Sequence, residues 1–304
     1  MKSRKASCTR RASSASEAGR SVRCRAKLQP CVAEIARIEP GELLLSDTLY
    51  EDPELKSYWR SLANVTPMPK ELFESATAER RLAVFFNVAT SESFGTFSRL
   101  ELSAAAAAAT YVERTQLASR PALIPPAREH AAGVMQIDAA TRNNLELLRT
   151  MGGDARGSLL SVIDRTVTAA GARMLARRLA SPLCGAKEIA RRLDSVDYFF
   201  EHWTLRAEIR KALASAPDLS RSLSRIALDR GGPRDLAAIG QALSAAFALS
   251  TVLKSSDGVP DEIALAAQAM GAPDRGLRDV IAKALADELP LSKRDGGFVR
   301  EGYN

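Results

Sequence analysis

The segment 152–158, Gly-Gly-Asp-Ala-Arg-Gly-Ser, has the glycine spacing of a loop that binds nucleotide phosphates through backbone N–H groups. Such a loop also needs a lysine directly after its last glycine, because that side chain reaches the terminal phosphates. Here Ser158 follows Gly157 instead, and the preceding segment has a helical pattern where a strand is required. We therefore predict a loop that ends a helix and does not bind ATP.

Three polar residues at and after this loop, Ser158, Ser161 and Asp164, have side chains of the types that a hydrolase uses. They are not part of a G-x-S-x-G motif, and no histidine accompanies them. His202 stands next to Trp203 without a nearby cluster of cysteines or carboxylates, which is typical of a structural histidine. We expect Ser158 to cap a helix and His202 to have a structural role, and we predict no catalytic residue.

Metal binding is not predicted either. The cysteines lack the paired C-x-x-C spacing of a zinc site, and only His130 and His202 could supplement them. Four cysteines in 304 residues are also too few for a secreted disulfide scaffold, which favours a reducing cytoplasm. The cysteines are Cys8, Cys24, Cys31 and Cys184.

No apolar run approaches the ~18 residues of a membrane span, so we expect no membrane partner.

The charge balance is basic but modest. The chain has 43 Lys and Arg against 36 Asp and Glu, a formal net charge of +7, which suits a polyanionic partner without identifying one. Residues 1–31 hold nine of these basic residues and one acid, Glu17, and we predict a disordered or unrelated leader there. Three basic pairs have the chemistry to contact phosphates, but we favour solvated helix faces: Arg177-Arg178, Arg191-Arg192 and Lys293-Arg294.

Between residues 32 and 118 the pattern predicts an α/β unit, in which proline and glycine separate short apolar strands from helices. Six consecutive alanines strongly favour the last helix, because alanine has no side-chain entropy to lose, and such a run also permits close packing against a sheet. The expected elements are a helix over Val32–Ile38, a strand over Glu42–Ser46, a strand at Val65-Thr66 cut off by Pro67 and Pro69, a helix from Thr77 broken at Phe94-Gly95, and a helix over Ser98–Leu117.

Residues 119–133 contain three prolines and are predicted to form an extended linker. After it, Asp138 is expected to cap a helix that ends at Gly152-Gly153, where Arg149 complements the negative helix end. Thr168 is expected to cap the next helix. Helical patterns follow this point throughout, so the second unit is predicted to be all-α.

Apolar residues in this second unit recur every three or four positions, so that each helix is expected to present one apolar stripe to a core. Pro233 and Asp235 suit the first turn of a helix, where a missing N–H is tolerated and an acid favours the helix dipole. The predicted stripes are Ile189, Leu193, Val196 and Phe200; Leu205, Ile209 and Leu213; Leu219, Leu223 and Ile226; Leu236, Ile239, Leu243 and Phe247; and Leu277, Ile281 and Leu285.

The stretch Met135–Leu183 carries two patterns, M-x-I-D-x-x-T-x-x-N-L-E-L and S-L-L-x-x-I-D-x-T-x-T-x-x-G-x-R-x-L-x-x-x-L-x-x-P-L. With about thirty specified positions in order, it resembles the opening of the helical core of the bacterial MutS mismatch-repair family. Segments 33–44 and 94–97 resemble the connector domain of that family, and segments 233–236 and 295–304 resemble later positions of its core. The resemblance covers about nine tenths of the chain.

This resemblance implies an α/β RNase H-like connector domain followed by an all-α core/lever helical domain. The predicted divisions are a basic leader over residues 1–31, an N-terminally incomplete connector over 32–118, a linker over 119–133 and the first part of the core over 134–304. For the complete family it implies binding of mismatched DNA coupled to ATP hydrolysis, with ATP and Mg²⁺ as cofactors. It also implies a homodimer whose main contacts lie in the ATPase domain.

The chain is expected to be truncated at both ends, with neither the mismatch-reading nor the ATPase domain. We therefore predict no enzyme activity by itself, no cofactor in this chain, and no catalytic, cofactor-binding or metal residues. Dimerisation of this part is not expected. Two other hypotheses stay open, namely a surviving module that binds MutL through the connector, and a free-standing basic DNA-binding protein.

The sequence departs from the family at three places. The connector normally opens with a D-x-S-T-G-x-F segment, of which only residues 22–26 resemble a remnant. Arg178 stands where the family commonly has tryptophan, so the site has either lost a core anchor or lies at a rim where an arginine can reach water. The tripeptide Phe199-Phe200-Glu201 matches the mismatch-reading Phe-x-Glu motif, but its position within a predicted amphipathic helix favours core packing of Phe200.

Overall fold

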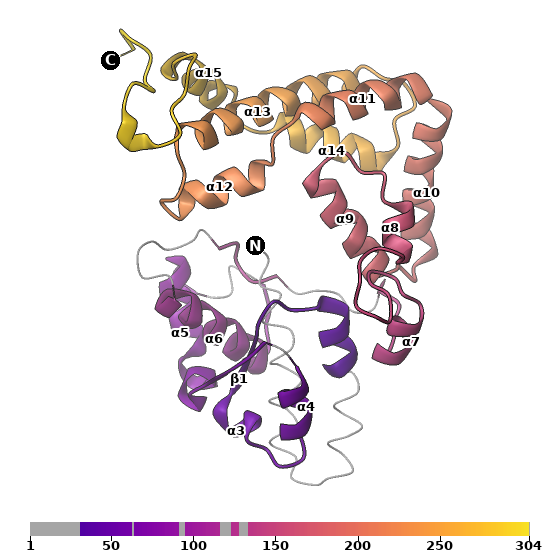
Figure 1. The fold of residues 1–304 in the computed structure, drawn as a ribbon, viewed down its shortest axis with the longest axis vertical. Coiled ribbons are helices and arrows are strands. Elements are labelled where there is room, and N and C mark those ends of the chain that lie inside the picture. Colours follow the sequence, from indigo (N-terminus) through magenta and orange to yellow (C-terminus); the bar gives the residue numbers. More distant parts are fainter. Residues whose placement is uncertain (1–30, 63, 91–94, 116–122, 128–132, 304) are drawn as a thin grey trace. The chain divides into compact units, whose positions relative to one another are not determined.

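The computed structural model describes residues 31–62, 64–90, 95–115, 123–127 and 133–303. The chain divides into two compact units, Met1–Ser161 and Val162–Asn304, which we call unit 1 and unit 2. Each is described by itself. In Figure 1 the colours follow the chain, from indigo at the start of the described part of unit 1 to yellow at the end of unit 2.

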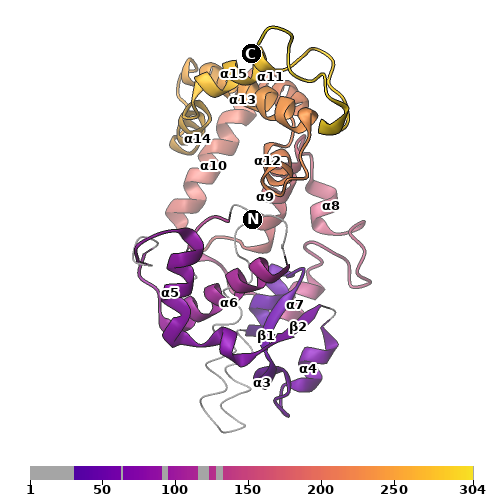
Figure 2. The same cartoon turned by 90° about the vertical axis from the view of Figure 1, so that its left-hand side faces the viewer.

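The described part of unit 1 starts with a helix over residues 31–38 and contains a parallel two-stranded sheet (Figure 2). Strand β1, Leu43–Ser46, pairs with β2, Val65–Met68. The prediction that Pro67 cuts off the second strand is wrong, because Pro67 lies within β2, opposite Leu45, and is exposed. Proline has no N–H to donate to a neighbouring strand, so it is tolerated at the edge of a sheet.

One apolar core of unit 1 surrounds Trp59, which lies on α4, Lys56–Ser61, and is 0 % exposed. The indole Nε1 donates a hydrogen bond to the carbonyl of Leu49 on α3, Asp47–Tyr50, at 3.1 Å, so its one polar atom is satisfied. Cys31 and Ile35 from the first helix and Leu45 from β1 complete the contact. The first helix, β1, α3 and α4 therefore pack around a single indole.

A second core of unit 1 lies between α5, Ser75–Phe86, and α6, Arg99–Thr115, after a 3-10 helix, η1, over Lys70–Phe73. Part of the alanine run packs against α5, a helix, where the sequence led us to expect close packing against a sheet. Small side chains allow two helix backbones to approach closely, which explains why this run is buried. The buried members are Ala78, Leu82, Ala105, Ala106 and Ala109.

Helix α5 ends at Phe86, earlier than predicted. Asn87 follows it with a positive φ of 53°, a left-handed conformation that asparagine adopts at helix ends more readily than most residues. The predicted break at Phe94-Gly95 is therefore not what ends the helix, and Phe94 lies outside the described residues. The predicted helix over Ser98–Leu117 is confirmed as far as Thr115, and Ser98 caps it by accepting from the backbone N–H of Glu101 at 3.3 Å.

Helix α7, Ala139–Asn144, is also shorter than predicted. Asp138 caps it as expected, since its carboxylate accepts from the backbone N–H of Thr141 at 2.9 Å. The chain leaves the helix at Asn144, and Glu146 follows with a φ of 47°. Arg149 does not complement a helix end, because its guanidinium donates to the carbonyl of Gly153 at 3.1 Å within the following loop.

Unit 2 is helical, as predicted. Its described residues contain no extended strand, only isolated bridge positions such as the antiparallel pair of Leu285 and Val299. The helices are α8, Leu159–Ile163, which crosses the division between the units; α9, Ala169–Ala180; α10, Ala186–Glu201; α11, Trp203–Ser215; α12, Leu219–Ala227; α13, Pro233–Lys254; α14, Asp261–Gly271; α15, Arg275–Ala284; and a short 3-10 helix, η4, Lys293–Asp295.

Helix α13 supplies residues to both apolar clusters of unit 2. In the first cluster, α13 contributes Ile239, Leu243 and Phe247, which pack with Ile281 of α15. In the second, it contributes Leu253, which packs with Ile263 of α14. By length and composition alone, α13 is the one described helix that could also cross a membrane. It contains no uninterrupted apolar run of that length, because Gln241, Ser244 and Ser250 interrupt its apolar residues. Its contacts with neighbouring helices are those of the central helix of a helical core.

The apolar stripe predicted on α10 is not buried. Leu193, Val196 and Phe200 are 59 %, 65 % and 74 % exposed, and Ile189 is exposed as well. The buried residue of this helix is Tyr198, on the opposite side, which packs with the α14 cluster. The core prediction for Phe200 is therefore wrong, because the helix turns an aromatic residue two positions away toward the core.

Candidate functional site

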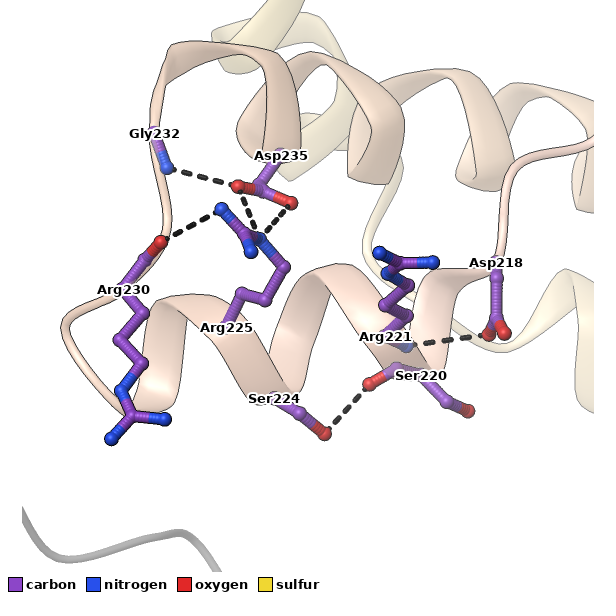
Figure 3. Close-up of polar contacts among 8 residues, drawn as sticks. All are labelled: Asp218, Ser220, Arg221, Ser224, Arg225, Arg230, Gly232 and Asp235. Carbon is purple, nitrogen blue, oxygen red and sulfur yellow. Dashed lines mark hydrogen bonds and ion pairs between the residues drawn. The ribbon is translucent and has the colours of Figure 1, made fainter. Parts of the chain in front are cut away.

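The densest polar arrangement of unit 2 lies at the corner between α12 and α13 (Figure 3). Asp218 caps α12, accepting from the backbone N–H of Arg221 at 3.3 Å. Gly231 and Gly232 then turn the chain into Pro233, the first residue of α13. Here a Cβ on Gly231 would lie 2.8 Å from the Cα atom of Ile226, so this close approach requires glycine.

Arg225 holds the corner together. Its Nε lies 3.0 Å from both carboxylate oxygens of Asp235 on α13, and its Nη2 donates to the carbonyl of Arg230 in the turn at 3.0 Å. Asp235 in turn accepts from the backbone N–H of Gly232 at 3.0 Å, as expected for an acid at a helix start. One arginine thus joins the second half of α12, the turn and the first turn of α13.

The electrostatics of the corner favour the charged form of Asp235. Partial burial alone would raise the pKa of this carboxyl group, but the Gly232 N–H and the Arg225 guanidinium outweigh it, so that the pKa lies below the usual range. The Arg173 guanidinium and the Arg221 N–H likewise lower the pKa of Asp218. Both aspartates are therefore anionic at neutral pH, and the corner is held by ionic contacts.

This arrangement can fix the direction of α13 relative to α12, but it offers no group for covalent or acid–base chemistry. Within the described residues, no group of three or more His, Cys, Asp and Glu side chains could hold a metal ion. The corner therefore has a structural role, which is to hold the start of α13 against the end of α12. Pro233 and Asp235 can be predicted from the sequence as residues of a helix start. Arg225 cannot, because its only signal is that it stands ten residues before that acid.

The Gly152–Ser158 segment does not fit ATP. The backbone N–H of Thr150 donates to the carbonyl of Asp154 at 2.8 Å, and the segment closes on itself as a turn. No lysine is available at the position after Gly157, so no side chain reaches a terminal phosphate. Ser158 caps α8 as predicted, with its Oγ 3.3 Å from the N–H of Ser161.

The other predicted residues lie apart from the corner. His202 has the expected structural role, because its ring stacks on Tyr198 at a centroid distance of 4.2 Å and its Nδ1 lies 2.8 Å from the Tyr198 carbonyl. The carboxylate of Asp164 accepts from the backbone N–H and the hydroxyl of its neighbour Thr166, and Asp164 is half-buried. No hydrolase arrangement forms from the described serines and this aspartate.

The structure divides the three basic pairs. Arg178 forms an ion pair with Glu262 at 2.6 Å, and Lys293 forms one with Asp229 at 2.7 Å. The side chain of Arg178 is 38 % exposed, which places it at a rim and excludes the buried alternative. Arg177 and Arg191 are exposed, and Arg192 is half-buried.

Two family models match the chain in sequence order. The model described as MutS domain II matches residues 22–124, and the model described as MutS domain III matches residues 140–301. The chain belongs to the MutS family. The resemblance read from the Met135–Leu183 stretch is therefore confirmed. A gap between residues 124 and 140 separates the two matched intervals, whereas the compact units divide between residues 161 and 162.

Curated MutS relatives agree with these matches. The protein named DNA mismatch repair protein MutS from Azorhizobium caulinodans is 55 % identical over 90 % of this chain, and one from Rhodopseudomonas palustris is 55 % identical over 89 %. A third, from Nitrobacter winogradskyi, is 52 % identical over 90 % of the chain. The chain spans only about 30 % of the length of these relatives.

Proposed function

We propose that this chain serves DNA mismatch repair as the connector and core part of a MutS-type protein. The observation that carries the proposal is the pair of matches to MutS domains II and III, in order, across residues 22–124 and 140–301. The RNase H-like fold of residues 32–118, the linker over 119–133 and the core over 134–304 belong to this proposal. The parallel pair of β1 and β2 and the all-helical unit 2 support it.

The role of this part is mechanical. By resemblance, a complete MutS-type protein binds mismatched DNA, ATP and Mg²⁺ through other domains, and the connector and core link them. Such a link works when helical elements hold defined directions, so that a bias at one end reaches the other. The α12–α13 corner supports this role, because three contacts of Arg225 fix the start of the 22-residue helix α13.

A chimera tests the proposal. Residues 22–301 of this chain replace the matching segment of the Azorhizobium caulinodans MutS, and the chimera is expressed in a bacterium that lacks its own MutS. We expect the spontaneous mutation rate to fall by at least about tenfold from that of the deficient strain. A soluble, full-length chimera that leaves the rate unchanged would contradict the proposal. The unaltered relative is the positive control.

The finer partner assignments follow from the same resemblance. MutL binding through the connector predicts that MutL retains this chain in a pull-down, and absence of retention removes that assignment.

DNA binding by this chain alone predicts a mobility shift of a mismatched duplex at low salt, where phosphate contacts are strongest. A cytoplasmic location, argued from the cysteines, and a homodimer of the complete protein remain predictions.

A further inference from the structure

Helix α9 is attached to unit 2 differently from its neighbours. None of its described residues belongs to either apolar cluster of the unit, whose members come from α10 to α15 and the segments after α13 and α15. Its own apolar side chains are only partly covered, with Met174 46 % exposed and Leu175 and Leu179 half-buried. Ala180 is buried but small. Apolar burial on this helix is therefore only partial.

Two ion pairs instead tie α9 to helices far along the chain. The Arg173 guanidinium meets both carboxylate oxygens of Asp218, at 3.0 and 3.3 Å, and Asp218 is the cap of α12. The Arg178 guanidinium meets Glu262, in the first turn of α14, at 2.6 Å. Glu262 also accepts from the hydroxyl of Ser195 on α10 at 3.0 Å.

Both acids lie at helix starts, where the helix dipole favours a negative charge. Both pairs also remain in reach of solvent, since side-chain exposure is 57 % for Arg173, 22 % for Asp218, 38 % for Arg178 and 35 % for Glu262. Exposed pairs are individually weak and are screened by salt. A helix held mainly by such pairs is held more loosely as ionic strength rises.

We propose that Arg173–Asp218 and Arg178–Glu262 form an ionic latch that docks α9 on unit 2 and releases it as ionic strength rises. Helix α9 is the first complete helix after the division at residue 161. Its release therefore lengthens the connection along the chain between the two units, and the latch sets how tightly that connection is held. This inference goes beyond the proposed repair function and does not depend on it.

Hydrogen–deuterium exchange of the whole chain tests the latch at 50 and 500 mM KCl. We expect amides of residues 172–180 to exchange about fivefold faster at high salt, as follows when two weak, screened pairs open. Amides in the centre of α13, whose contacts are apolar, are the internal reference and are expected to keep their rates. Equal salt responses in α9 and α13, or no response in α9, would overturn the proposal.

Variants separate the latch from a general effect of salt. Glu262→Gln and Arg178→Met are each expected to speed exchange in α9 at 50 mM KCl and to weaken its salt response. Arg177→Met is the matched control, because Arg177 is the exposed neighbour and no ion pair of its side chain appears in the described structure. It is expected to behave like the unaltered chain.

The charge-swapped double variant Arg178→Glu with Glu262→Arg is expected to recover at least half of the protection lost in Glu262→Gln. Failure of the swap to recover protection, in a variant whose α13 amides keep their rates, would contradict an ionic cause. So would an Arg177→Met variant that loses as much protection as Arg178→Met. The α13 amides identify any variant that fails to fold, and Glu262→Gln, which preserves side-chain shape, then decides the question.

Discussion

The two tryptophans of the chain lie in opposite environments. Trp59 in unit 1 is 0 % exposed, and its indole N–H is bonded to a backbone carbonyl, whereas Trp203 in unit 2 is 67 % exposed. Leu45 and Leu82 of unit 1 are inaccessible, while Phe200 of unit 2 is 74 % exposed. Unit 1 is organised around apolar centres, and unit 2 adds ionic joints to a smaller apolar core.

The difference indicates what each unit depends on. Buried apolar contacts carry no charge that salt can screen or a proton can neutralise, whereas exposed ion pairs are weakened by both. In unit 2 the apolar clusters lie along α13, and the helices at its margin are joined by Arg225–Asp235, Arg173–Asp218 and Arg178–Glu262. The centre of unit 2 is thus expected to be firm and its margin adjustable, as suits a mechanical link.

The largest expected effect is that of Trp59→Ala in unit 1. Removing a fully buried indole leaves a cavity and should lower the free energy of unfolding by about 3–5 kcal/mol. Trp203→Ala, at an exposed indole, should change it by less than about 0.5 kcal/mol. Urea unfolding followed by circular dichroism measures both. Equal losses of unfolding free energy for the two variants would contradict the difference in environment between the two tryptophans.

A second pair of variants examines the apolar part of unit 2. Leu243→Ala, in the α13 cluster, should cost about 2–5 kcal/mol, because this leucine is only 6 % exposed. Leu193→Ala, in the exposed stripe of α10, should cost less than about 0.5 kcal/mol. Thermal melts compare the two. A large loss at Leu193 would mean that the α10 stripe is buried in solution.

A smaller effect is expected at the α12–α13 corner. Asp235→Ala removes a helix-start acceptor and the partner of Arg225, which should cost about 1–2 kcal/mol. Asp194→Ala, at an exposed aspartate on α10, is the control and should leave stability nearly unchanged. Urea unfolding of unit 2 provides the measurement. Equal free energies of unfolding for the two variants would contradict the structural role of the corner.

The corner also predicts a pH dependence. The folded-state pKa of Asp235 lies below its unfolded value, which is about 3.9. Its contribution to stability is therefore complete above the unfolded pKa and is lost as pH falls through the folded pKa. Urea midpoints measured from pH 6 to pH 2 should fall in this acidic window for the unaltered chain. The fall should be smaller for Asp235→Ala, and identical curves would contradict the assignment.

The smallest expected effect is the coupling within the latch. A double-mutant cycle of Arg178→Met and Glu262→Gln should give an interaction energy of about 0.2–1 kcal/mol at low salt, the range for exposed pairs. At 500 mM KCl the coupling should be smaller, because screening weakens the pair. Urea titrations at both salt concentrations provide the values. A coupling that is independent of salt would mean that packing, and not charge, joins these residues.

Features encoded by a few neighbouring residues could be predicted from the sequence. The caps at Asp138 and Thr168 depend on one side chain and an N–H three residues later, and both form as expected. The first turn of α13 at Pro233 is equally local. The family itself was evident because the Met135–Leu183 pattern specifies many positions at once.

Features that depend on distant partners could not be predicted. Periodicity places Phe200 on an apolar stripe, but it does not reveal whether another element covers that stripe, and in the described structure it is exposed. The positive φ that follows the end of α7 falls on Glu146, a residue type that rarely adopts this conformation, so the local sequence does not mark it. The pairing of Arg178 with Glu262 joins residues 84 positions apart, and no local pattern records it.

We propose that this chain contributes the link between DNA reading and ATP turnover in a complete MutS-type protein, and the purified chimera tests this proposal most directly. The measurement is ATP hydrolysis by the chimera with a mismatched duplex, with a matched duplex and without DNA, beside the unaltered Azorhizobium caulinodans MutS. The account predicts that a mismatched duplex changes turnover in the chimera by the same factor as in the relative, within about twofold. A chimera that binds mismatched DNA and hydrolyses ATP normally, but whose turnover ignores the duplex, would contradict it.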